Sequence, residues 1–161
     1  MDGAAILNDT GVATLADDEA FTNLVAALVA DQKENAPRPE GFVPSTSLWM
    51  VRDDEVVGFL QLRHRLSPFL LEQGGHIGYS VRPSARRRGY ASVALVESLG
   101  FAHGLGLESV LLVCDESNVG SRRVIEGAGG VYEDSRVGKR RYWIPTSSKP
   151  NSGVALPLTK A

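Results

Sequence analysis

The spacing of apolar side chains divides the first half of the chain into a helix and two strands. Apolar residues recur three and four positions apart over 18–31, which is typical of an amphipathic helix. These residues are Phe21, Leu24, Val25, Leu28 and Val29. Strand-like runs follow at 47–52 and 56–63, and the turn Asp53-Asp54-Glu55 between them predicts a hairpin.

The second half of the chain alternates between strand and helix patterns. We expect a loop at Glu72-Gln73-Gly74-Gly75, then a third strand over 76–81 that Pro83 ends. Residues 91–103 have helical spacing and stop at Gly104-Leu105-Gly106, in the manner of a C-cap. The remaining expected elements are a buried strand over 110–114, a short helix over 121–128, and strands over 131–133 and 140–144. This order predicts an α/β domain with a mixed sheet.

Length and composition predict one ordinary globular domain. The chain has 161 residues, of which 43% are apolar and 22% charged, so it can bury its own core. We expect a single domain over 1–145 and a loose C-terminal tail over 146–161, where serine, proline and small residues dominate. The chain has neither a signal-like N-terminus nor a run of eighteen apolar residues, and its single cysteine excludes an internal disulfide. We therefore expect a cytoplasmic protein with no membrane partner.

Charge is the first pointer to a ligand. A net charge of -2 argues against a nucleic-acid partner, yet Arg82 and the run Arg86-Arg87-Arg88 form a local basic cluster. The cluster lies between an expected strand and an expected helix, where free first-turn amides and the helix dipole favour anions. Gly89 and the small Ala91 would let a phosphate approach the backbone. The segment predicts a site for a di- or polyphosphate; the alternative is a solvated basic turn.

Two motifs carry a resemblance to a known family. Arg86-Arg87-Arg88-Gly89-Tyr90-Ala91 resembles the Arg/Gln-x-x-Gly-x-Gly/Ala signature of the GNAT N-acetyltransferase superfamily, and it is neither a Walker loop nor a Gly-x-Gly-x-x-Gly fingerprint. Asn118, Ser121 and Gly129 match the family positions beside the pantetheine arm. The resemblance covers roughly residues 47–144. Within it, 75–79 and 140–144 are similar to a bacterial branch of predicted acetyltransferases.

The resemblance implies a fold and an activity. It implies an α+β domain whose mixed, mostly antiparallel sheet is flanked by helices and splayed at the acetyl-CoA site. It also implies an N-acetyltransferase in which a primary amine, of a small molecule or a peptide, attacks acetyl-CoA directly and no metal takes part. A homodimer stays open. The implied coenzyme ligands are Tyr79, Ser80, Val81, Arg86, Arg87, Arg88, Gly89, Tyr90, Ala91, Asn118, Ser121 and Arg122.

The acid and base of the reaction stay open at this stage. Ile125 stands where many relatives carry a tyrosine acid. Substitutes for it are Tyr79, Tyr132, Tyr142, Ser121 or a water, with a structural ring as the alternative for each tyrosine. As the base we consider His76, whose unperturbed pKa suits the task, and Glu72. The alternative for His76 is a structural, hydrogen-bonded histidine.

Other residues and functions are weighed beside these. His64, Phe42, Trp49 and Trp143 are candidates for the acceptor side, with surface exposure or core packing as their alternatives. Cys114 is either a nucleophile or a small core residue. Asp115 and Glu116 lack the His/Cys cluster of a metal site. The competing functions are a CoA-binding sensor without activity, which Ile125 favours, and a nucleotide-phosphate binder of another class.

Overall fold

A seven-stranded mixed sheet organises the protein in this computed structural model, which describes residues 18–146 and 158–160. The strand order is β5-β6-β4-β3-β2-β1-β7, and only the β3–β4 pair is parallel. The strands are β1 Ser45–Arg52, β2 Glu55–Arg63, β3 Ile77–Val81, β4 Ser109–Asp115, β5 Val131–Arg136, β6 Lys139–Pro145 and β7 Leu158–Lys160. The mixed, mostly antiparallel sheet expected from the sequence is confirmed.

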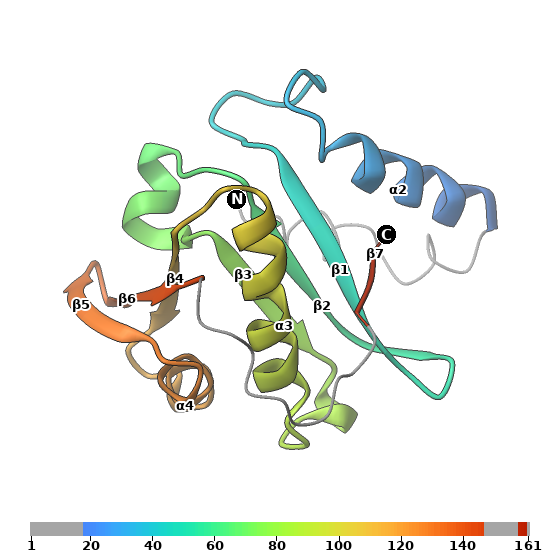
Figure 1. The fold of residues 1–161 in the computed structure, drawn as a ribbon. Coiled ribbons are helices and arrows are strands. Elements are labelled where there is room, and N and C mark those ends of the chain that lie inside the picture. Colours follow the sequence, from blue (N-terminus) through green and yellow to red (C-terminus); the bar gives the residue numbers. More distant parts are fainter. Residues whose placement is uncertain (1–17, 147–157, 161) are drawn as a thin grey trace.

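Three α-helices accompany the sheet in the described part of the chain. They are α2 Asp18–Ala30, α3 Tyr90–Gly104 and α4 Val119–Gly127. Helix α3 crosses the middle of the sheet, and α2 lies beyond the β1 side (Figure 1). All three expected helices are confirmed, although α4 begins two residues earlier than its pattern indicated.

The core lies between α3 and one face of the sheet. Alternate residues of β1 and β2, such as Leu48, Leu60 and Leu62, are fully buried there. They pack in one cluster with Leu95 and Leu99 of α3. The C-terminal turn of α3 is closed by two backbone bonds, from Gly106 N–H to His103 and from Leu107 N–H to Ala102, in the manner of a Schellman motif.

Helix α2 covers the opposite face of the sheet, and much less tightly. None of its residues is buried, and Phe21 and Val29 of the expected apolar stripe are exposed. Phe21 still contacts Trp49 of β1, with ring centroids 5.6 Å apart. The apolar stripe of α2 therefore faces a cavity more than a filled core.

The expected loop at 72–75 was wrong. Residues Leu70–Gly74 form a short π-helix, in which Leu70 is buried and Gly75 N–H donates to the Leu70 carbonyl at 2.6 Å. Gly75 ends the turn with φ 68°, and a Cβ there would lie 2.5 Å from the Leu111 carbonyl oxygen. The paired glycines indicated an irregular loop, whereas burial of Leu70 and the close approach to β4 stabilise a helical turn.

Three residues of the expected loose tail form a strand. Leu158–Lys160 form β7, which pairs antiparallel with β1 at the edge of the sheet. Residues 147–157 and 161 lie outside the described part of the chain, so the division into a 1–145 domain and a 146–161 tail stays a prediction.

Candidate active site

The sheet opens between its two parallel strands. Ile77 of β3 is in register with Leu112 of β4, and this is the one ladder pair between these strands. Beyond it, Gly78 to Val81 pair with β2 alone, while β4 pairs with β6. The diverging strands leave a cavity of about 270 Å³, which Tyr79 and Cys114 help to line. We call it the splay cavity.

A tight turn leads from β3 into α3. One 3-10 turn, Pro83–Ala85, follows the strand, and Gly89 then caps α3 with no side-chain hydrogen bond. Gly89 has φ 85°, and a Cβ there would meet nothing within 4 Å, so the protein's own packing does not require a glycine. The left-handed backbone favours one, and the open space leaves the first-turn amides of α3 accessible. This is the geometry of an anion site at a helix N-terminus.

The arginines of the turn have different roles. Arg86 Nε donates to the Val81 carbonyl at 3.0 Å, which fastens the turn to β3. The Arg88 guanidinium lies 5.6 Å from the ring centroid of Tyr90. That ring is buried at 3% exposure, and its hydroxyl accepts a hydrogen bond of 2.9 Å from Arg52. Tyr90 therefore offers a ligand its backbone rather than its ring.

The start of α4 faces this turn. Asn118 caps α4, because its Oδ1 accepts a hydrogen bond from Ser121 N–H at 3.0 Å. Ser121 Oγ in turn lies 2.8 Å from the hydroxyl of Tyr79 on β3. Burial raises the pKa of Tyr79 to about 12, so the phenol keeps its proton at neutral pH.

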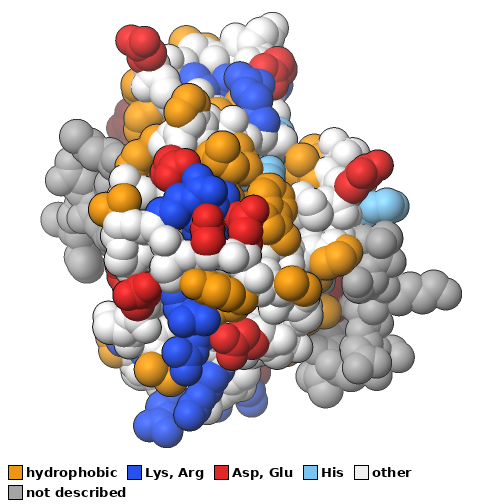
Figure 2. Space-filling view, turned by 90° about the vertical axis from the view of Figure 1, so that its left-hand side faces the viewer, with side chains coloured by type: hydrophobic (Ala, Val, Ile, Leu, Met, Phe, Trp, Pro, Cys, Tyr) orange, Lys and Arg blue, Asp and Glu red, His pale blue; other side chains and the backbone are white. Residues whose placement is uncertain are grey.

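A cleft of about 640 Å³ lies between the turn and α4. We call it the coenzyme cleft. Ten of the twelve predicted coenzyme ligands line it, namely Tyr79, Ser80, Val81, Arg86, Arg87, Gly89, Tyr90, Ala91, Asn118 and Ser121. Arg88 and Arg122 do not line it, and Arg122 forms an ion pair with Glu126 at 3.8 Å. Basic side chains gather at the lower end of the face drawn in Figure 2, the end of the molecule at which α3 begins (Figure 1).

A third cavity, of about 590 Å³, lies beneath α2 and the loop that follows it. We call it the acceptor cavity. Its floor is the sheet face opposite the core, where Ser45, Ser47, Phe59, Gln61 and Arg63 alternate with the buried apolar residues. The walls are mostly apolar and include Leu24, Ala27, Leu28, Pro37, Pro39, Phe42, Val43 and Phe69.

The splay cavity shares lining residues with each of the other two cavities. The splay cavity shares Tyr79, Asn118 and Ser121 with the coenzyme cleft. It shares Phe59, Gln61 and Arg63 with the acceptor cavity. The predicted phosphate site at the start of α3 thus shares lining residues with the gap between two strands, and that gap shares lining residues with a pocket on the far face of the sheet.

The family follows from a direct comparison with known proteins. A family model described as "Acetyltransferase (GNAT) domain" matches residues 9–131, which is more than half of the chain. The chain belongs to the GNAT acetyltransferase family. Membership supports acetyl transfer as its general activity, with acetyl-CoA as the cosubstrate. A search of curated protein sequences found no match.

Solved structures agree on the fold. The GNAT domain of PAT from S. lividans matches with a TM-score of 0.55 at 15% identity, over 80% of this chain and 86% of that one. A mutant of the spermidine N-acetyltransferase SpeG from Vibrio cholerae matches with a TM-score of 0.53 at 14% identity, over 81% of this chain and 76% of that one. At these identities the likeness extends to the GNAT fold alone.

Ile125, at the position where many GNAT relatives carry a tyrosine, is a core residue. The side chain is 1% exposed and belongs to the core cluster, and it also borders the splay cavity. Of the tyrosines considered as substitutes, Tyr79 alone lines any of the three cavities. Tyr142 is buried and bonded to Arg140 and Glu126, and Tyr132 bonds Ser135 on the outer strand β5.

His76 stands at the closed end of the splay. Its Nδ1 accepts a hydrogen bond from Leu111 N–H at 2.9 Å, and its own backbone N–H donates to the Leu111 carbonyl at 2.7 Å. The ring is 5% exposed, and burial, helped by Arg63, lowers the pKa of His76 to about 4. A neutral imidazole with Nδ1 engaged continues the β3–β4 pairing, which favours the structural alternative over a catalytic base.

Glu72 is engaged elsewhere. Its Oε1 accepts a hydrogen bond from Arg136 at 2.5 Å, and the residue lines none of the three cavities. This ion pair ties the π-helix to β5. The geometry gives no support to Glu72 as the base.

Among the residues considered for the acceptor side, Phe42 lines a cavity and the others do not. Phe42 lines the acceptor cavity, whereas His64 bonds Thr46 at 2.8 Å and Trp143 packs edge-on against His76. Cys114 is buried, and burial raises the pKa of its thiol, which suits a core residue better than a nucleophile.

The part of the chain that the structure describes shows neither a metal-binding cluster nor a membrane-spanning helix. Asp115 is paired with Lys139, and no group of three or more potential ligands gathers there that could hold a metal. Within the same residues, every helix is too short or too polar to cross a bilayer.

The sequence missed the floor of the acceptor cavity. Ser45, Gln61 and Arg63 gave no motif, because they come from different strands and meet only through strand pairing. The available signal was the alternation at the paired ends of the two strands, Ser45 and Ser47 on β1 and Gln61 and Arg63 on β2, which marks a face that is not core.

Proposed function

We propose that this GNAT protein transfers the acetyl group of acetyl-CoA to a primary amine by direct attack. The observation that carries the proposal is a row of three neighbouring cavities, from the turn at 86–91 through the splay to the acceptor cavity, in which each shares lining residues with the next. Direct transfer needs both substrates in one site, approaching from opposite ends. A row of this kind provides for that arrangement.

The coenzyme end of this row is assigned to backbone groups. The amides at Gly89, Tyr90 and Ala91 open α3 and would accept the pyrophosphate, with Arg86 and Arg87 adding charge at the rim. On its splay side, β3 has no strand partner over Gly78–Val81, and an extended pantetheine arm fits there as an added strand does. Acetyl-CoA supplies an acetyl group already activated as a thioester.

Tyr79 is assigned to the leaving sulfur. Its hydroxyl lies where the coenzyme cleft meets the splay cavity. A pKa of about 12 makes the phenol a weak proton donor but a durable hydrogen-bond donor, suited to stabilising charge that develops on a departing thiolate. The amine nitrogen forms the new C–N bond as the C–S bond breaks, and the proton lost by nitrogen passes through water to the departing sulfur, which leaves as the CoA thiol.

We assign no side chain as general base. His76 and Glu72 are both engaged in structural bonds, as described above. An acceptor cavity with apolar walls disfavours a charged ammonium, so it selects the neutral amine that the reaction needs. The SpeG neighbour is named for acetylating spermidine, which supports amines as the class of acceptor without identifying this one.

A second candidate function is a CoA-binding sensor without turnover. The observation in its favour is Ile125, which replaces the usual tyrosine with a buried apolar side chain. A nucleotide-phosphate binder is the third reading, and competition between ligands separates it from the other two.

The deciding experiment measures binding and turnover separately. Calorimetry gives the Kd for acetyl-CoA, with ATP as the competitor, and release of the free CoA thiol reports turnover across a panel of primary amines. The proposal expects acetyl-CoA binding that ATP does not displace, and amine-dependent thiol release. Tight binding with no release on any amine would establish the sensor, while displacement by ATP would overturn both readings.

A further inference from the structure

One buried polar atom of a residue that lines the site, Gln61 Oε1, has no hydrogen-bond partner among the described residues. This atom is inaccessible to solvent. A buried acceptor left unsatisfied is costly, and such atoms in folded proteins commonly await a ligand or a water. Gln61 lines both the splay cavity and the acceptor cavity. The Gln61 side chain therefore borders both cavities.

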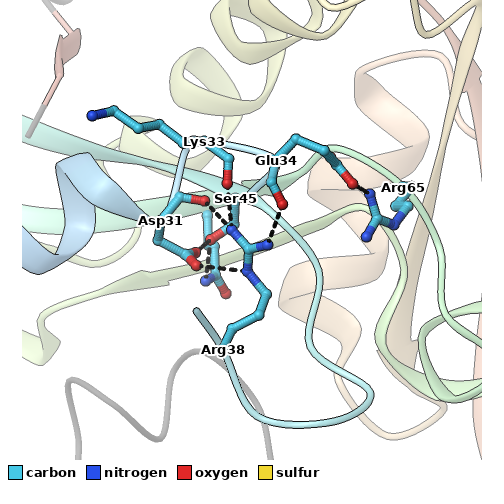
Figure 3. Close-up of polar contacts among 7 residues, drawn as sticks. Asp31, Lys33, Glu34, Arg38, Ser45 and Arg65 are labelled. Carbon is cyan, nitrogen blue, oxygen red and sulfur yellow. Dashed lines mark hydrogen bonds and ion pairs between the residues drawn. The ribbon is translucent and has the colours of Figure 1, made fainter. Parts of the chain in front are cut away.

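The orientation of this amide is fixed by its neighbours. Ser45 Oγ donates to Asp31 Oδ2 at 2.6 Å, since a carboxylate can only accept (Figure 3). Having donated its proton, the Ser45 oxygen can only accept from Gln61, which it does from Nε2 at 2.9 Å. The amide must therefore present NH₂ to Ser45 and leave Oε1 for something else.

Asp31, which anchors this chain of bonds, is itself held in place. Arg38 Nε donates to Asp31 Oδ1 at 3.2 Å, and its other nitrogens donate to the carbonyls of Asp31, Lys33 and Glu34 (Figure 3). The Arg38 side chain is largely buried in doing so. The loop after α2 and the acceptor floor thus form one preorganised network, in which the Asp31 charge is already paired.

The neighbouring strand leaves room beside the amide. Gly78 of β3 stands in register with Gln61 and carries no side chain. A Cβ at Gly78 would meet its nearest atoms, on Arg63, at 3.7 Å, so packing does not force a glycine there. The absence of a side chain leaves the splay cavity open toward Gln61.

We infer that the acceptor is a primary amine carried on an apolar group, and that its N–H donates to Gln61 Oε1. This inference rests on the function proposed above. The mostly apolar walls would hold the hydrocarbon part of the acceptor. One neutral carbonyl suits one amino group, and its bond leaves the nitrogen lone pair free for attack. A polyamine would need carboxylates for its further cations. Of the two that line the acceptor cavity, Asp31 is paired with Arg38 and Glu40 lies exposed in the loop after α2.

The test uses the unmodified protein first. At saturating acetyl-CoA, kcat/KM is measured for straight-chain alkylamines from propylamine to hexylamine, for phenethylamine and for spermidine. Burial of each added methylene should raise kcat/KM by up to about fourfold until the cavity is filled. Spermidine should be a poorer substrate than hexylamine. A flat alkylamine series, or spermidine as the best acceptor, would overturn the inference while leaving acetyl transfer intact.

The role of Gln61 is tested with a near-isosteric variant. Gln61→Met should raise the KM for hexylamine about tenfold or more, with the KM for acetyl-CoA unchanged. Gln32→Met is the matched control, because Gln32 lines none of the three cavities, and both constants should stay at their original values. If Gln61→Met binds acetyl-CoA normally and keeps its amine KM within twofold, the assignment of Oε1 is wrong. If no amine reacts with the unmodified protein, the proposed function falls first.

Discussion

The hydroxyl of Tyr79 lies 2.8 Å from Ser121 Oγ, and this contact spans the mouth of the splay from β3 to α4. The two residues come from elements that share no strand pairing, yet both line the coenzyme cleft and the splay cavity. Asn118 caps α4 and holds Ser121 in place, because its side chain accepts a hydrogen bond from Ser121 N–H. The phenol is thus held by its partner, and its proton is kept by burial.

Replacing Tyr79 with phenylalanine tests its assignment to the leaving sulfur. Tyr79→Phe should lower kcat about 10²-fold, because one preorganised donor to the departing thiolate is lost. The Kd for acetyl-CoA, measured by calorimetry, should change little, since the ring remains. Tyr132→Phe serves as the control, because that hydroxyl bonds Ser135 on β5 and is exposed. Equal kcat values for the two variants would remove Tyr79 from the chemistry.

Gly89 offers a prediction in which strain and ligand contact can be separated. Gly89→Glu should abolish acetyl-CoA binding, because a carboxylate would occupy and repel the phosphate position. The left-handed backbone adds a stability cost of about 1–2 kcal/mol for any side chain. Binding is followed by calorimetry and stability by urea unfolding.

Gly106, at the other end of α3, is the matched control for Gly89. Its φ of 82° and empty surroundings resemble those of Gly89, with φ 85°, yet it lines none of the three cavities. Gly106→Glu should lose a similar amount of stability and keep full affinity for acetyl-CoA. Loss of affinity in both variants would mean that strain alone, and not position, is responsible.

The turn was predictable from sequence because its chemistry is local. Arg86, Gly89 and Ala91 lie within six positions, and the strand before them and the helix after them are set by short-range hydrophobic patterns. The start of the helix follows from that one stretch, whereas the left-handed conformation of Gly89 and the cleft formed with α4 come from the structure. Asn118 and Ser121 were implied by the family resemblance, and the structure adds that Asn118 caps α4 by accepting from Ser121 N–H.

The acceptor end was not predictable in the same way. Asp31, Ser45 and Gln61 form one hydrogen-bonded chain but come from a loop and two strands. Strand register decides whether such residues meet, and a shift of one position would turn Gln61 into the core. His76 shows the same limit, because the sequence leaves a base and a structural histidine both open, and only the bond from Leu111 N–H to its Nδ1 favours the structural role.

Arg86 gives a prediction about the electrostatic part of coenzyme binding. Arg86→Met keeps the methylene stem but removes the guanidinium, so the Kd for acetyl-CoA should rise by about three- to tenfold at low salt. The difference between variant and original should shrink as ionic strength increases, because exposed charges are screened. Arg65→Met is the comparison, since Arg65 is paired with Glu34 and lines none of the three cavities. A loss of affinity that is independent of salt would point instead to the lost bond with Val81.

His76 makes stability depend on pH in a defined window. Its pKa is about 4 in the folded protein against 6.5 unfolded, so the unfolded chain binds the extra proton as the pH falls between these values. The contribution is complete above pH 6.5 and declines toward pH 4, by about 3 kcal/mol in total. His76→Asn retains an acceptor for Leu111 N–H but cannot titrate. Its free energy of unfolding, from urea denaturation at a series of pH values, should therefore fall less steeply below pH 6.5. Parallel curves for His76→Asn and the original protein would show that the imidazole is not held neutral in the splay.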